Sequence, residues 1–183
     1  QVTFRPTGTT GYSASINLAN GLCANIGCFG VGVPAQNFGQ DLLGIFWDNN
    51  YLEAEIINTQ PNSLFNGYLV MSNPSSSGGI LGWECQVEVL GPAIMLGWQL
   101  EGNNINIGSG SDFVVGLASP LPYTDQTLLG TFEVIALEPD QYVTFNVLPT
   151  RIPSVPDQMS WIPGSDPDAL LPLHTRWGDP MVA

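Results

Sequence analysis

Residues 82–89 read Gly-Trp-Glu-Cys-Gln-Val-Glu-Val, and this stretch decides the class of fold. Successive side chains of a β-strand point to opposite faces of the sheet, so a strand with one buried face alternates strictly. Tryptophan, cysteine and valine are typical of a core, whereas a row of polar side chains indicates a face in water. The stretch therefore predicts a strand of a layered β-protein. Its core face carries Trp83, Cys85, Val87 and Val89, and its wet face carries Glu84, Gln86 and Glu88.

Short apolar or alternating segments follow one another along the rest of the chain. Glycine (21 residues) and proline (15 residues) are frequent, and the turns that they mark recur at a spacing typical of sandwiches and barrels. No segment combines the periodicity of an amphipathic helix with end caps. The sequence therefore predicts an all-β fold, with strands at residues 42–47, 67–71, 83–89, 93–100, 104–107, 113–117, 128–137 and 142–148.

Three of these strands carry a resemblance to a known family. They read Gly82-Trp83-Glu84-Cys85, Phe113-Val114-Val115-Gly116-Leu117 and Leu129-Gly130-Thr131-Phe132-Glu133-Val134. The segment from residue 67 to residue 148 resembles cohesin-type and related immunoglobulin-like β-sandwich modules of secreted bacterial proteins of unknown function. The resemblance covers under half of the chain and implies an immunoglobulin-like (cohesin-like) β-sandwich. Its motifs mark a fold rather than an activity.

Both ends of the chain differ from this central region. Residues 1–40 predict an arm, in which residues 12–19 alternate like a half-buried strand. From residue 149 onward a proline occurs every few residues. Because proline fixes φ and lacks an N–H, this composition predicts an extended tail that packs on the sandwich or on a neighbour. We therefore expect an N-terminal arm at 1–40, a β-sandwich at 41–148 and a proline-rich tail at 149–183.

The charge balance excludes several classes of partner. The chain has 16 acidic residues, three arginines and no lysine, and its net charge is −13. Nothing in it could neutralise a run of phosphates, so we expect no nucleic-acid partner. The same charge disfavours anionic membrane surfaces. No stretch approaches the ~18 apolar residues of a membrane-spanning helix. Gln1 is followed at once by an alternating strand, which is typical of a terminus left by signal peptidase and predicts a secreted, extracellular protein.

The three cysteines predict one disulfide and one free thiol in an exported protein. Cys23 and Cys28 could close a small ring in a region rich in glycine and asparagine. Alternatively, one of them pairs with Cys85. Three cysteines do not make a structural zinc site, because such a site takes four ligands and the only histidine, His174, is far away in the sequence.

The candidate catalytic residues of the sequence predict that the chain is not an enzyme. His174 lies in the proline-rich tail, and no Gly-x-Ser-x-Gly motif is present. Glu84 and Glu88 share a strand face, but four residues of strand span about 13 Å, which is too far for the two carboxylates of a glycosidase. We also expect no cofactor. The one candidate ion is calcium, at Asp48 and at the pair Asp166 and Asp168, because carboxylates are ligands that calcium prefers.

These observations predict an extracellular structural subunit that assembles into a fibre or surface layer through its terminal segments, as a homo-oligomer or polymer. Alternating, nearly uncharged segments can add to an open sheet edge. The candidate residues for this assembly are Val2, Phe4, Tyr12, Ile16 and Leu18. The alternative is a secreted adhesion module that binds a surface glycan or a protein, since the chain contains five tryptophans and five tyrosines. No Asn-x-Ser/Thr acceptor for N-glycosylation is present.

Overall fold

The computed structural model describes residues 11–16, 26–31, 39–55 and 60–176 of the 183-residue chain. Within these residues it contains β-strands and no helix, which confirms the all-β class. The strands form a two-stranded sheet and a ten-stranded sheet. They are β1 (Gly11–Ile16), β2 (Ile26–Val31), β3 (Leu42–Phe46), β4 (Ser63–Ser72), β5 (Ile80–Leu90), β6 (Ala93–Leu100), β7 (Asn104–Asn106), β8 (Asp112–Leu121), β9 (Gln126–Ala136), β10 (Thr144–Leu148), β11 (Met159–Pro163) and β12 (Leu171–Thr175).

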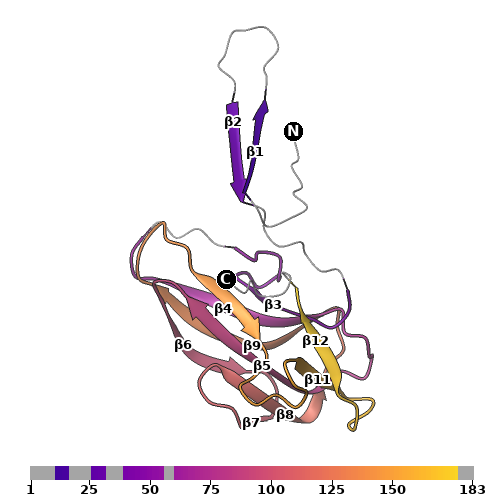
Figure 1. The fold of residues 1–183 in the computed structure, drawn as a ribbon. Helices are drawn as coiled ribbons and strands as arrows, with labels where there is room; N and C mark the ends of the chain where they lie inside the picture. Colours follow the sequence, from indigo (N-terminus) through magenta and orange to yellow (C-terminus); the bar gives the residue numbers. More distant parts are fainter. Residues whose placement is uncertain (1–10, 17–25, 32–38, 56–59, 177–183) are drawn as a thin grey trace.

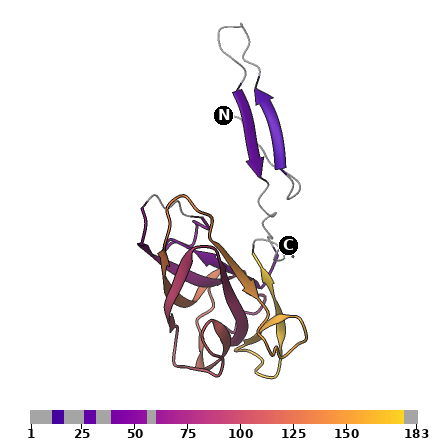
Figure 2. The ribbon, with the colours of Figure 1, turned by 60° about the vertical axis from the view of Figure 1, so that its left-hand side comes forward.

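The ten-stranded sheet curls on itself into an incomplete barrel (Figures 1 and 2). Its strand order is β6-β9-β4-β3-β12-β11-β5-β8-β7, and β10 pairs with the part of β5 that β11 leaves free. One half of the sheet consists of β6, β9, β4 and β3, and the other half contains β5, β8 and β7. The halves are joined through β11 and β12, and β12 pairs with β3 in parallel. The sheet ends at β6 on one side and at β7 on the other.

The core fills the space between the two halves of the sheet, and aromatic rings connect them. Trp98 of β6 stacks on Phe132 of β9, with ring centroids 4.3 Å apart, and meets the ring of Phe113 on β8 edge-on at 4.6 Å. Phe113 in turn lies 5.6 Å from Trp83 of β5. Aromatic pairs at these separations add to the stabilisation that burial alone provides. Trp98 of β6 therefore contacts Phe132 in its own half of the sheet and Phe113 in the opposite half.

Strand β5 shows the alternation that the sequence predicts on its core face. Trp83, Cys85 and Val87 are buried, and Val89 is half-buried close to the end of the strand. The prediction that Glu84 faces water is wrong, because its side chain is only 4% exposed. The tail covers it: both the N–H and the hydroxyl of Ser154 donate to the Glu84 carboxylate, at 3.0 and 2.8 Å, and the buried Ser160 hydroxyl donates at 2.5 Å.

The tail contributes two strands to the ten-stranded sheet. Strand β11 pairs with β5 and buries Trp161 completely, and β12 connects β11 to β3. Pro172 is tolerated inside β12 because β12 pairs with β11 over residues 171–173 and with β3 only from His174 onward. Its missing N–H therefore removes no bond to β3. The sequence predicts an extended tail without strands in this segment, because its prolines hide the short pairings between them.

The arm contains a hairpin of its own. β1 and β2 pair antiparallel with Tyr12 opposite Gly30 and Ile16 opposite Ile26, and neither strand joins the ten-stranded sheet. Both views draw this two-stranded sheet away from the barrel (Figures 1 and 2). Of the residues proposed for assembly, Tyr12 and Ile16 belong to β1, whereas Val2, Phe4 and Leu18 lie outside the described residues.

Candidate functional site

The outer face of β4, β9 and β6 carries side chains in rows that run across the three strands. The register places Leu64, Ile135 and Ile94 in one row, and Tyr68, Thr131 and Gln99 in another. Between these rows, Asn66 faces Glu133. The first row is apolar, and its two outer members, Leu64 and Ile94, are 56% and 49% exposed. The face therefore offers an apolar strip beside a polar one.

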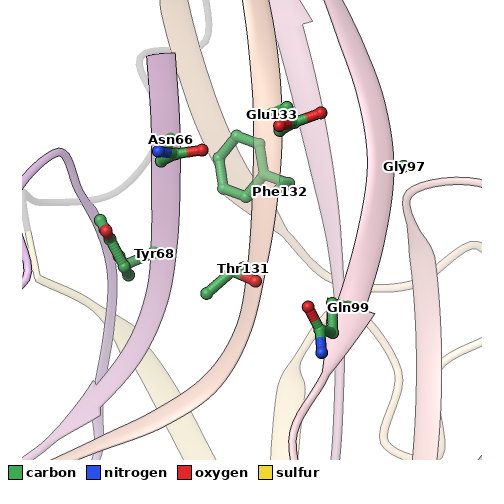
Figure 3. A pocket seen from close by; sticks show the side chains of 7 residues that line it. All are labelled: Asn66, Tyr68, Gly97, Gln99, Thr131, Phe132 and Glu133. Carbon is green, nitrogen blue, oxygen red and sulfur yellow. The ribbon is translucent and has the colours of Figure 1, made fainter.

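A shallow hollow of about 280 Å³ lies over the polar part of this face (Figure 3). Asn66 and Tyr68 of β4, Thr131 and Glu133 of β9, and Gln99 of β6 line it. The pairing of β6 with β9 shifts between Met95 and Trp98, and Gly97 lies within this β-bulge. Because Gly97 has no side chain and a Cβ there would meet no atom within 4 Å, the surface is hollow at that point.

Aromatic rings stabilise one end of the hollow. The Tyr51 ring lies 5.9 Å from that of Tyr68 and 6.2 Å from that of Phe46, and the guanidinium of Arg176 lies 5.3 Å from the centre of the Phe46 ring. Partial burial raises the pKa of the Tyr51 phenol, and the carboxylate of Glu101 adds to the effect. The hollow thus combines one aromatic side chain, Tyr68, with amide, hydroxyl and carboxylate groups, which are the groups that bind sugar hydroxyls.

The tryptophans do not contribute a platform to this face. Trp83 and Trp161 are buried, and Trp47 and Trp98 pack against the core. Trp177 lies outside the described residues. Aromatic surface is instead supplied by tyrosines, of which Tyr142 is 96% exposed at a distance in sequence from the hollow. The tryptophan content therefore belongs mainly to the core and does not favour glycan binding.

A second, larger hollow lies where the barrel fails to close. It has a volume of about 520 Å³ and is lined by Met95, Leu96, Gly97 and Trp98 of β6 on one side and by Gly110 and Ser111 on the other. The loop that carries Gly110 and Ser111 is fastened to β5, because the Val87 N–H donates to the Ser111 carbonyl at 2.8 Å. We call this hollow the seam groove, since it separates the edge strand β6 from the loop between β7 and β8.

Asp48 closes a loop after β3. One of its carboxylate oxygens accepts bonds from the N–H groups of Leu52 and Glu53, at 2.8 and 2.7 Å, and the other accepts from Asn50 at 3.1 Å. The bond from Glu53 is the main cause that lowers the pKa of the Asp48 carboxyl, despite an opposing effect of desolvation. Asp48 therefore acts as a loop cap in the structure, which is the common use of aspartate after a strand.

Asp166 and Asp168 lie in a turn between β11 and β12. The Asp168 N–H donates to an Asp166 carboxylate oxygen at 3.3 Å, and the Ala169 N–H donates to the Asp166 carbonyl. His174 is exposed on β12 and does not accompany a nucleophile in any described contact. Among the described residues, no group of three or more histidine, cysteine, aspartate or glutamate side chains could hold a metal ion.

Cys85 is a buried free thiol in the described part of the chain, which does not favour the alternative in which Cys85 forms the disulfide. Its side chain points into the core from β5, and burial raises the pKa of the thiol, with smaller contributions from the carboxylates of Asp112 and Glu84. The other alternative joins Cys23 and Cys28. Cys23 lies outside the described residues, and of Cys28 only the backbone, in β2, is described.

The sequence predicts neither hollow, because each depends on the bulge in β6. The segment 93–100 was predicted as a strand, and an isolated glycine within a strand is the signal that indicates a bulge. Gly97 supplies that signal. What no single-sequence pattern indicates is that Asn66, Glu133 and Gln99, which come from three separate strands, meet on one face.

Comparison of the chain with protein-family models, with curated proteins and with solved structures finds no match. In the part of the chain that the structure describes, no helix is long and apolar enough to cross a membrane.

Proposed function

We propose that this protein is an extracellular structural subunit that self-assembles into a fibre or surface layer through its N-terminal arm. One observation carries the proposal: β1 and β2 form a two-stranded sheet that pairs with no strand of the barrel. An isolated two-stranded hairpin is marginally stable in water, and three or more strands are normally needed for stability. A hairpin of this kind gains stability by joining the sheet of a neighbour.

The distribution of charge supports docking of the arm on a second copy. The first 40 residues contain Arg5 and no acidic residue, so all 16 acidic residues of the chain lie in residues 41–183. With only two arginines, that part of the chain has a net charge of −14. Two such bodies repel each other, whereas the arm of one copy meets no like charge on the body of another.

The proposal includes an immunoglobulin-like, cohesin-like sandwich as the detailed fold. Its support is the pairing of two sheet halves over a shared core, with the strand that contains Gly82-Trp83-Glu84-Cys85 paired on one side with β8 and on the other with β10 and β11. The proposal also takes the subunit to be secreted and without enzymatic activity, cofactor or nucleic-acid partner. The high acidic charge and the absence of lysine support the exclusion of nucleic acid.

Sedimentation velocity and electron microscopy of the purified chain test the proposal. Assembly should strengthen with added salt, because salt screens the repulsion between bodies over ~8–10 Å. It should also strengthen as pH falls toward the sequence pI of about 4.1, where the net charge vanishes. A chain without residues 1–40 should keep the thermal transition of the barrel, whose strands all begin at or after Leu42, but should stay monomeric. Assembly by this shortened chain, or monomers of the full chain under all these conditions, would contradict the proposal.

The hollow over β4, β9 and β6 favours a second candidate function, binding of a neutral surface glycan. Tyr68 supplies a ring on which a sugar could stack, and Asn66, Gln99 and Thr131 supply hydrogen-bonding groups around it. An array of neutral oligosaccharides, followed by calorimetry of any ligand found, tests this function. Replacing Tyr68 by alanine should abolish binding, whereas the same replacement at the exposed Tyr142 should leave it unchanged. Equal effects of the two substitutions, or no binding on the array, would eliminate this candidate.

A further inference from the structure

We propose that the seam groove along β6 is the acceptor for the β1–β2 hairpin of a second copy, which adds to β6 and closes the barrel. This inference rests on the proposed assembly and gives it a location. It identifies the partner as another molecule of this chain and the contact as sheet extension by main-chain hydrogen bonds, a mode that recurs in protein recognition.

Strand β6 has the features of an open acceptor edge. In the described part of the chain it pairs with β9 alone and ends the ten-stranded sheet. Its eight residues, Ala93–Leu100, contain no charged residue and no proline. Soluble proteins usually protect a long edge strand with charges, prolines or a covering segment, and an uncharged open edge favours pairing with another chain. By contrast, β7, the opposite end of the sheet, is only three residues long.

The groove beside this edge is bounded by a wall on each side. Its volume is about 520 Å³, and β6 forms one wall through the bulged residues 95–98. The loop with Gly110 and Ser111 forms the other wall, and its bond to the Val87 N–H holds it in place. Met95 and Trp98 are half-buried and pack against the core, so the floor of the groove is apolar. An added strand would therefore continue the core as well as the sheet.

The backbone of the hairpin is suited to this site. Each of its strands has six residues, about 20 Å at the usual rise per residue, and β6 has eight. The register of β1 with β2 pairs Tyr12 with Gly30, Ala14 with Cys28 and Ile16 with Ile26. In a strand added beside β6, one face of the hairpin lies over the floor of the groove. In the sequence of β1, Tyr12, Ala14 and Ile16 alternate with Ser13 and Ser15, and the apolar set is the one that we assign to this floor.

Charge decides between the hairpin and a second β6 as the occupant of the edge. Pairing of β6 with β6 of another copy would bring together two bodies of net charge −14 directly across the contact. Pairing of β6 with the hairpin brings a body against an arm whose only charge is Arg5. Glu133, which lines the neighbouring hollow beside Gly97, provides negative charge close to the edge. The arm is therefore the complementary partner.

Replacing Gly97 by lysine tests this assignment in the full chain. A Cβ at Gly97 meets no atom within 4 Å, so the substitution should leave the fold intact while it places a charged side chain on the edge of the groove. The matched control is the replacement of Gly116 by lysine. Gly116 is an exposed glycine in β8, its Cβ also meets no atom within 4 Å, and it does not line the groove. Sedimentation velocity at several protein concentrations measures assembly, and thermal unfolding checks the fold.

We expect Gly97→Lys to raise the concentration needed for assembly about tenfold or more, as charge on an edge strand opposes strand addition. Gly116→Lys should assemble like the unmodified chain. Leu96 is the neighbouring residue and is 36% exposed, so Leu96→Lys should reproduce the effect of Gly97→Lys. The second variant keeps the test valid if one of the two fails to fold. If the chain without residues 1–40 stays monomeric while Gly97→Lys and Leu96→Lys assemble normally, the acceptor assignment is refuted and the proposed function stands. If the shortened chain assembles, both are refuted.

Discussion

The buried carboxylate of Glu84 fastens the C-terminal tail to the barrel, and its removal should release that tail. Glu84 is 4% exposed on β5 and accepts three hydrogen bonds, two from Ser154 and one from Ser160. Ser160 belongs to β11, the strand that pairs with β5 and buries Trp161. We expect Glu84→Ala to destabilise the protein more than any other single replacement of a carboxylate described in the structure.

The loss of stability in Glu84→Ala depends on whether each hydrogen-bond donor to Glu84 can bond to water instead. Ser154 is exposed, so its N–H and hydroxyl can turn to water when Glu84 is removed. The Ser160 hydroxyl is 1% exposed and would lose its acceptor inside the protein, which costs about 1–3 kcal/mol. With the loss of two further bonds to a charged group, Glu84→Ala should cost about 2–4 kcal/mol. Glu84→Gln keeps the shape and one carbonyl acceptor, so about 1–2 kcal/mol is expected.

Glu88→Gln is the matched control. Glu88 lies on the same strand and on the same face of it as Glu84. It is less buried than Glu84 and accepts one hydrogen bond, from the Asn146 side chain at 3.2 Å. Its replacement should change the free energy of unfolding by about 0.5 kcal/mol or less. Urea denaturation at pH 7 measures all three variants. If the change in the free energy of unfolding for Glu84→Ala equals that for Glu88→Gln within error, Glu84 does not hold the tail on the barrel.

Trypsin gives a second, local measurement of the same prediction. The chain has no lysine and three arginines, and Arg151 is exposed in the segment between β10 and β11. In the unmodified protein this segment is held by the Arg151 N–H bond to Asp112 and by the bonds of Ser154 to Glu84. Cleavage after Arg151 should therefore be faster in Glu84→Ala than in Glu88→Gln. Equal cleavage rates would show that the tail is held mainly by its strand pairing.

Three further predictions concern the core, the free thiol and the Asp48 loop. Trp83→Ala should cost about 3–5 kcal/mol in urea denaturation, because Trp83 is 3% exposed and its ring packs on Phe113; an unchanged midpoint would show that this face is not core. Cys85 should resist thiol reagents in the native protein, since burial raises the pKa of its thiol. Unfolding without reductant should expose one reactive thiol per chain if Cys23 and Cys28 form a disulfide. It should expose three if they do not. The lowered pKa of Asp48 means that its contribution to stability is present above the unfolded pKa of 3.8 and is lost as pH falls through the lower folded pKa. The near-ultraviolet circular dichroism of Tyr51, whose ring contacts those of Phe46 and Tyr68, should therefore stay constant down to about pH 4 and change below it, and Asp48→Ala should remove that step.

The sequence by itself determined the β class and most strand positions, because period-two alternation and glycine or proline turns are local signals. The segment 93–100 was predicted with the bounds that β6 has, and the buried face of β5 at Trp83, Cys85 and Val87 follows from the alternation alone. The separation of a nearly uncharged arm, with Arg5 as its only charged side chain, from a strongly acidic body is likewise a property of composition, which needs no coordinates.

Only the tertiary structure decided which segments lie side by side. Glu84 alternates like a solvent-facing residue, but it is buried because the tail, 70 or more positions later in the chain, covers it. The strands β11 and β12 are likewise hidden in the sequence, because prolines surround their short pairings. The seam groove exists because the curled sheet brings β6, at one end of it, beside the loop that joins β7, at the other end, to β8. Alternation specifies which face of a strand is apolar, whereas the partner that covers a face depends on contacts between residues far apart in the chain.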